Sequence, residues 1–141
     1  MNNFTGEKHT AAVMVNNLDW DTDAESLLVD ITGRRGQAVI YLVAKEDASV
    51  ATSKKLDIGV HNVASDSVTP STDNKVGAFT QIVGSNSGGT VSISDAVIVN
   101  LEGLEGKYLQ CNMVETSTWD GFVTIVAILP DAGYLPTTLE G

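Results

Sequence analysis

The order of hydrophobic and polar residues along the chain predicts a protein built from short β-strands. Residues 107–115 alternate between apolar side chains such as Cys111 and polar ones such as Asn112, as a strand with one buried face does. Residues 122–129 are apolar on both faces, which is typical of a central strand in a covered sheet or of a strand at a subunit contact. A turn ending in Asp120-Gly121 joins the two segments, so we expect a central hairpin with a positive φ at this pair.

The remaining hydrophobic segments extend this pattern over most of the chain. Turn residues separate them at short intervals, and no segment has the period of a long helix. The sequence therefore predicts an all-β fold, a two-layer antiparallel β-sandwich that is jelly-roll-like or immunoglobulin-like. We expect an N-terminal arm over residues 1–12, the sandwich over 13–130 and a C-terminal tail over 131–141. The other expected strands cover residues 11–15, 27–31, 37–44, 54–64, 76–83, 91–94 and 96–101, the last two separated by a break near Asp95.

The residues that most often carry catalysis give no pattern of an active site. Cys111 falls on the apolar side of its strand, where a small buried side chain is expected rather than a nucleophile. His61 falls on the polar side of residues 54–64, which predicts a surface histidine. No Ser/His/Asp order, zinc spacing or paired carboxylates can be argued, so we expect a protein that is not an enzyme and that has no cofactor.

Charge narrows the classes of partner. The chain has 141 residues, enough for one domain, and a formal net charge of −10. Its basic pairs are Arg34-Arg35 and Lys54-Lys55, so direct binding to nucleic acid or to an anionic membrane is not expected. The first residues lack the apolar core of a signal peptide, and no segment approaches the roughly 20 apolar residues of a membrane span. We expect a product made and kept in a cytoplasm, unless it leaves as part of a larger particle.

One acidic segment has the spacing of a metal loop. The three candidate calcium ligands, which follow the spacing that opens an EF-hand loop, are Asp19, Asp21 and Asp23. The sixth position of that loop is Ala24 instead of glycine, and the twelfth is Asp30 instead of glutamate. Thr22 and Glu25 alternatively form a capping box over a short turn, and the departures from the ligand pattern favour this interpretation. We therefore predict no metal site.

The turn Gly33–Gly36 contains the two adjacent arginines. Its glycines offer left-handed conformations, which a tight turn needs. Arg34 and Arg35 either bind a carboxylate on a partner or lie on a solvated turn and keep a sheet edge from pairing, and the second interpretation is the more common case.

Four segments between Gly36 and Leu129 resemble a known group of proteins. They are the strand 38–43, the segment 56–67 with its Ser-Asp turn, the strand start Gly106-Lys-Tyr-Leu-Gln110, and the aliphatic strand 121–129. This order is similar to that of small β-sandwich structural proteins of tailed bacteriophages. The resemblance implies a capsid decoration (cement) protein on the virion exterior, made in the host cytoplasm, that binds the major capsid protein and self-associates as a homotrimer. Residues that we expect at capsid or subunit contacts are Asn2, Phe4, His9, Arg34, Arg35, Trp119, Tyr134 and Leu135.

A glycan- or receptor-binding module of a phage tail or fibre is the alternative function. The aromatic residues that could stack on sugars are Trp20, Tyr41, Trp119 and Tyr134. Trp119 is the best of them, because it lies at the tip of the expected hairpin, where an exposed aromatic ring is otherwise unfavourable. The competing interpretation is that Trp119 folds back onto the sheet or docks on another subunit.

Overall fold

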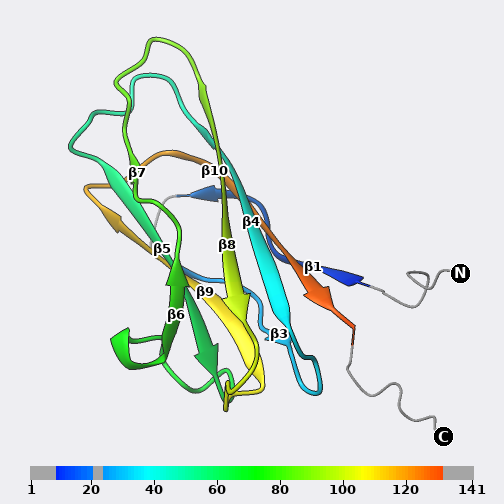
Figure 1. The fold of residues 1–141 in the computed structure, drawn as a ribbon. Helices are drawn as coiled ribbons and strands as arrows, with labels where there is room; N and C mark the ends of the chain where they lie inside the picture. The colour runs from blue at the N-terminus through cyan, green and yellow to red at the C-terminus, as the bar shows by residue number, and fades with distance from the viewer. Residues whose placement is uncertain (1–8, 21–23, 132–141) are drawn as a thin grey trace, which may run out of the picture.

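The structure, a computed structural model, describes residues 9–20 and 24–131. The described residues form two antiparallel sheets that pack face to face, which confirms the predicted β-sandwich (Figure 1). A short 3-10 helix, η2 (Thr72–Asn74), lies between two strands of one sheet. The strands are β1 (His9–Trp20), β2 (Ala24–Glu25), β3 (Val29–Asp30), β4 (Gln37–Glu46), β5 (Lys55–Val63), β6 (Lys75–Ala78), β7 (Ile82–Val83), β8 (Val91–Asn100), β9 (Tyr108–Thr116) and β10 (Gly121–Pro130).

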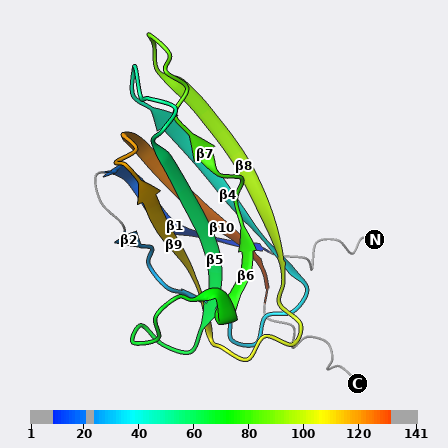
Figure 2. The same cartoon turned by 90° about the vertical axis from the view of Figure 1, so that its left-hand side faces the viewer.

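The strand order identifies which type of sandwich this is. One sheet has the order β1-β10-β4-β8, and the other has β2-β9-β5-β6, with β3 also paired to β9 and β7 to β5. The chain passes from one sheet to the other between β1 and β2, β3 and β4, β4 and β5, β7 and β8, β8 and β9, and β9 and β10. This exchange of strands between two four-position sheets is the jelly roll, and it decides between the two expected architectures (Figure 2).

The expected central hairpin is wrong, because β9 and β10 lie in different sheets. β9 pairs with β5, β2 and β3, whereas β10 pairs with β1 and β4. The turn between them is a corner in which Ser117 and Thr118 have φ values of 58° and 52°. Gly121, at φ 158°, has the positive φ expected at the Asp120-Gly121 pair, and Ser117 and Thr118 add two left-handed residues that the sequence did not indicate. Alternation along each strand is the same in a hairpin and in two strands that face each other across a core, so the sequence did not separate the two arrangements.

The core lies between the two sheets and is apolar. Ile40 of β4 and Ile125 of β10 have no exposed surface, and Leu56 of β5 and Met113 of β9 oppose them from the other sheet. Cys111 is buried, as expected, and desolvation raises the pKa of its thiol to about 12. A thiol in this state is a core side chain and not a nucleophile.

Two expected boundaries differ from the structure. β1 begins at His9, so residues 9–12 of the expected arm belong to the sandwich; they pair with residues 127–130 because β10 extends to Pro130. The rest of the arm, residues 1–8, lies outside the described residues. β8 runs without the expected break at Asp95, because it pairs with β4 at every position from Val91 to Asn100. The Asp95 carboxylate accepts hydrogen bonds from the backbone N–H groups of Thr80 and Ala96, at 2.9 and 2.8 Å.

These hydrogen bonds make Asp95 a pH-dependent stabilising group. The Thr80 N–H holds the pKa of this carboxyl below its usual range. A lowered folded-state pKa stabilises the fold above the unfolded-state pKa, and this contribution is lost as the pH falls through the folded value. We expect Asp95→Asn to lower the urea midpoint at pH 7, and the difference from the wild type to shrink below roughly pH 4. Asp66→Asn, at an exposed loop position, is the control and should show no such pH-dependent difference.

The predicted surface position of His61 is also wrong. The residue is 5% exposed, and its Nδ1 lies 2.8 Å from Oδ1 of Asn74, which belongs to η2. The segment that contains η2 covers this end of β5, and the pairing of β5 with β6 shifts register between Val60 and His61. A polar residue on the expected outer side of a strand is thus buried by a loop that strand periodicity does not reveal.

Candidate interaction surfaces

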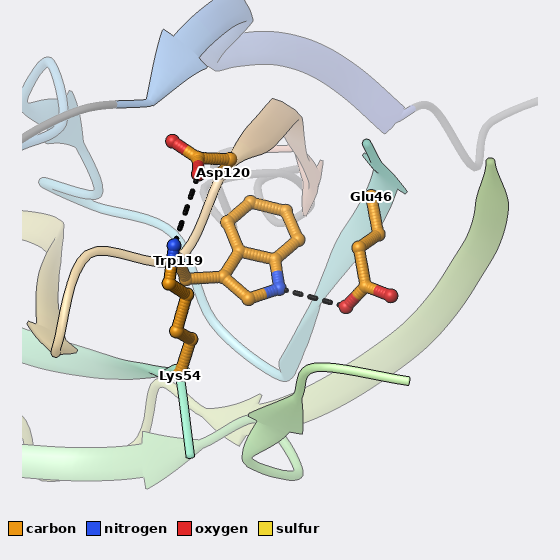
Figure 3. A network of polar contacts seen from close by, with 4 residues as sticks. All are labelled: Glu46, Lys54, Trp119 and Asp120. Atoms are coloured by element: carbon orange, nitrogen blue, oxygen red, sulfur yellow. Dashed lines mark hydrogen bonds and ion pairs between the residues drawn. The ribbon is translucent and has the colours of Figure 1, made fainter. Parts of the chain in front are cut away.

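The corner between β9 and β10 is held by a buried polar network. Trp119 has no exposed surface, and its indole N–H donates a hydrogen bond to Oε2 of Glu46, at 3.0 Å (Figure 3). Glu46 is equally buried, and its other oxygen accepts hydrogen bonds from the backbone N–H and the hydroxyl of Ser85. Lys54 and Asp120 form an ion pair next to this network, at 3.5 Å. The network thereby ties the end of β4 and the loop after β7 to the corner.

Trp119 is consequently not a contact or sugar-stacking residue of the surface. Its ring lies in the core because the chain turns a corner between the sheets instead of forming an exposed hairpin tip. The interpretation that Trp119 folds back onto the protein is the one that the structure shows. Among the other aromatic candidates, Tyr41 is 49% exposed, whereas Tyr134 and the side chain of Trp20 lie outside what the structure describes.

Three expected contact residues gather at one end of the sandwich. His9 pairs in register with Pro130, and Nη1 of Arg34 donates a hydrogen bond to the carbonyl oxygen of Pro130, at 2.6 Å. Arg34 is therefore half-buried against its own chain, while the adjacent Arg35 is exposed. We call the region formed by His9, Arg34, Arg35 and Pro130 the terminal end, because the start of β1 lies beside the end of β10 there (Figure 1). The other expected contacts, Asn2, Phe4, Tyr134 and Leu135, lie outside the described residues.

The second surface is the solvent side of the sheet β1-β10-β4-β8, which we call the outer face. Four of its side chains are large, apolar and about half exposed or more: Val13 (51%), Tyr41 (49%), Val43 (57%) and Ile98 (62%). The strand register places further residues beside them, and most of these are apolar. Neighbours across the strands form the rows Ala11-Ile128-Val39-Ile98, Val13-Val126-Tyr41-Ala96 and Thr124-Val43-Ser94.

Acidic side chains are absent from the centre of the outer face, in the part of it that the structure describes. Of the carboxylates in these four strands whose side chains the structure describes, Glu46 is buried in the core, and Asp95 shares a face with buried Leu42. Lys45 and His9 are the basic side chains at the margins of the face. At the margin of the face, Asp47 lines a shallow hollow together with Lys45 and Phe122, and the strand register pairs Asp19 with Phe122. In the part of the chain that the structure describes, the apolar rows at the centre of the face are thus free of carboxylates.

No metal site is formed by the part of the chain that the structure describes, where no three His, Cys, Asp or Glu side chains are grouped to hold an ion. The calcium candidates Asp21 and Asp23 lie outside the described residues, as does the side chain of Asp19. No described helix is long and apolar enough to cross a membrane.

A depression of about 540 Å³ lies between the η2 segment and the loop before β9. Asn62 lines it, but the amide of this residue already donates hydrogen bonds to the carbonyl oxygens of Gly106 and Tyr108 and accepts one from the Gly106 N–H. The amide therefore holds the loop in place, and it is not a group kept for a ligand.

No protein-family model matches this chain, and no curated protein matches it by sequence. Solved structures do share its fold. The SPBc2 prophage-derived protein YomS superposes with a TM-score of 0.51 at 13% identity, covering 89% of this chain and 95% of that one. VP2 of the infectious bursal disease virus subviral particle gives 0.56 at 9% identity, over 91% of this chain and 33% of that one.

Eiger TNF from S. frugiperda also shares the fold, with a TM-score of 0.52 at 11% identity, over 96% of this chain and 99% of that one. At these identities the likeness is one of fold. The chain spans about a third of the viral protein VP2, but nearly the whole length of YomS and of Eiger. A jelly roll of this size is thus found in a prophage-derived protein, in part of a viral particle protein and in a TNF protein.

Proposed function

We propose that this chain is a non-enzymatic virion structural protein that binds the outer surface of a phage capsid and stabilises it, acting as a homotrimer. The observation that carries the proposal is the jelly-roll fold shared with a prophage-derived protein over 89% of this chain and with part of a viral particle protein. The strand pattern between Gly36 and Leu129, which resembles small phage structural proteins, points in the same direction.

The physical properties of the chain suit this role. A protein that binds the assembled lattice and not free subunits stabilises the shell by mass action, without any catalytic group. The net charge of −10 keeps the chain in solution before docking and away from packaged nucleic acid. At the terminal end, Arg35 offers an exposed guanidinium that can bind a carboxylate of the capsid through two parallel hydrogen bonds.

Co-sedimentation of the purified chain with expanded cognate capsids tests this proposal. We expect the wild type to sediment with capsids and Arg35→Glu to bind at least about tenfold more weakly, since the variant places a carboxylate where a guanidinium docks. Lys55→Glu is the control. It makes the same charge change at the start of β5, which lies at the other end of the sandwich from Arg35. No binding by the wild type would refute the function, whereas equal binding of Arg35→Glu would place the docking site elsewhere.

A glycan- or receptor-binding module of a phage tail or fibre is the second candidate. The observation in its favour is the half-exposed ring of Tyr41 at the centre of the outer face, because an exposed aromatic ring can stack on a sugar. A glycan array in which the wild type binds and Tyr41→Ala does not would support this candidate. An array without hits would count against it.

A further inference from the structure

We propose that the outer face is the surface through which copies of this chain associate with one another. The partner of this face is the same face of a second copy of the chain. Such a contact is two-fold, so the trimer of the proposed function would need a further, different contact, and the inference does not rest on that function.

The first argument is the polarity of the face. An antiparallel sheet with one solvated side normally alternates apolar residues inward and polar residues outward. The outer side of the other sheet mixes the two kinds of residue: it carries the polar Asp57 and Asn112 beside the exposed Val114 and Val83. On the outer face, Tyr41, Val43 and Ile98 occupy the corresponding outward positions and are about half exposed or more. Exposed apolar side chains that adjoin one another mark an interaction site.

The second argument is charge, and it favours another copy of the chain as the partner. Two copies that each carry −10 repel one another, and the repulsion is smallest where neither copy presents a carboxylate. The apolar centre of the outer face meets this condition, because Glu46 and Asp95 of its strands are turned away from it and Asp47 lies only at its margin. A basic partner would instead bind most strongly where the acidic groups are gathered.

The third argument is size. The face spans four strands that lie about 4.8 Å apart and run for up to ten residues at about 3.3 Å per residue, an area of roughly 600 Å² per copy. Two such faces in contact would bury about 1,200 Å² in total, which exceeds the roughly 1,000 Å² expected of a specific interface. Both central strands of the face, β10 and β4, have sequences that are apolar on both sides.

The test is the solution mass of the full chain, measured by light scattering during size-exclusion chromatography over a range of concentrations. The monomer mass is 14.8 kDa, and we expect a discrete multiple of it for the wild type. Val43→Glu places a carboxylate in the middle of the face and should weaken association at least about tenfold, because a buried unpaired charge opposes contact. Val114→Glu, at a 41% exposed position on the other sheet, is the matched control and should leave the mass unchanged.

Circular dichroism and thermal melting establish that each variant is folded. If Val43→Glu does not fold, Val43→Thr keeps the shape of the side chain and adds a hydroxyl, and it should weaken association to a smaller extent. A wild type that is monomeric at every concentration would overturn the inference. So would a wild type whose oligomer is unchanged by either Val43 variant.

Deletion of residues 132–141 tests whether the end of the chain covers the face instead. A full chain that is monomeric and a shortened chain that associates would identify that segment as the occupant and overturn the inference. Capsid binding separates this result from the proposed function. A monomer that sediments with capsids would refute the self-association face and the homotrimer but leave capsid binding intact, whereas an oligomer that does not bind capsids would refute capsid binding alone.

Discussion

Replacing Trp119 by alanine should lower the free energy of unfolding by about 3–5 kcal/mol, the range for deletion of a large buried aromatic ring. The ring has no exposed surface, so its removal leaves a cavity that the surrounding sheets can fill only in part. The variant also removes the indole N–H that donates to the buried carboxylate of Glu46. A buried acceptor without its donor adds to the cost.

The corner makes this position more sensitive than an ordinary core site. Ser117 and Thr118 hold left-handed backbone conformations that cost non-glycine residues of order 1–3 kcal/mol each, and Thr118 is β-branched. The packing of Trp119 and its bond to Glu46 hold the corner in this strained form. Without them, the chain between β9 and β10 has less to keep it in the conformation that sends β10 into the other sheet.

Urea denaturation at several protein concentrations measures this effect and allows for any oligomer. Trp119→Phe is the matched variant, because it retains most of the apolar volume but loses the N–H donor and part of the ring system. We expect its loss of unfolding free energy to be smaller than that of Trp119→Ala. A loss below about 1 kcal/mol for Trp119→Ala would mean that the ring is not in the core, since exposed positions tolerate substitution at that level.

The second large effect is expected at Gly84, after β7. A Cβ at this position would lie 2.0 Å from the carbonyl oxygen of Ala51, a contact with backbone that no side-chain rotation can relieve. The close approach is maintained by the Gly84 N–H, which donates to the carbonyl oxygen of Lys54 at 2.8 Å. Gly84→Ala must therefore separate two loops and should cost about 3 kcal/mol, at the upper end of the range for overpacking.

Gly88→Ala in the same loop is the control for this prediction. A Cβ there would meet no atom within 4 Å, and we expect a change within about 0.5 kcal/mol. In thermal melting, the first variant should lower Tm by about 10 °C and the second by no more than a degree or two. Equal melting temperatures for the two variants would contradict the close packing of Gly84 against Ala51.

Sequence periodicity was sufficient to predict the individual strands, but it did not predict how the strands pair into sheets. The buried positions of β5 were read correctly at Leu56, Ile58 and Val60, because each strand obeys the two-residue period on its own. The pairing of β9 with β10 was predicted wrongly, since each strand buries the same apolar side whether the two strands pair or lie in different sheets. The corner at Ser117 and Thr118 carries no glycine at its left-handed positions, so the usual marker of such a turn is missing.

For the candidate surfaces too, the sequence indicated the character of single strands but not which strands lie side by side. The two-sided apolar character of residues 122–129 was visible in the sequence and indicated either a covered strand or a subunit contact. That Val13, Tyr41 and Ile98 lie on the same face as this strand depends on a register that joins residues far apart in the chain. His9 and Arg34 likewise meet only through Pro130, at the far end of β10. Such long-range registers cannot be read from local patterns.

The pairing of the first described strand with the last has a consequence for how the protein is made. Within the described residues, β1 pairs with β10 and with no other strand, and β4 pairs only with β8 and β10, so this sheet lacks its centre until residues 121–130 exist. During synthesis, β1 and β4 emerge from the ribosome as apolar strands without that shared neighbour. Pairing between strands so far apart is slow, and unpaired apolar strands aggregate. We expect the nascent chain to remain incompletely folded until its last strand has been translated, and chains interrupted before Gly121 to be degraded or lost to aggregation.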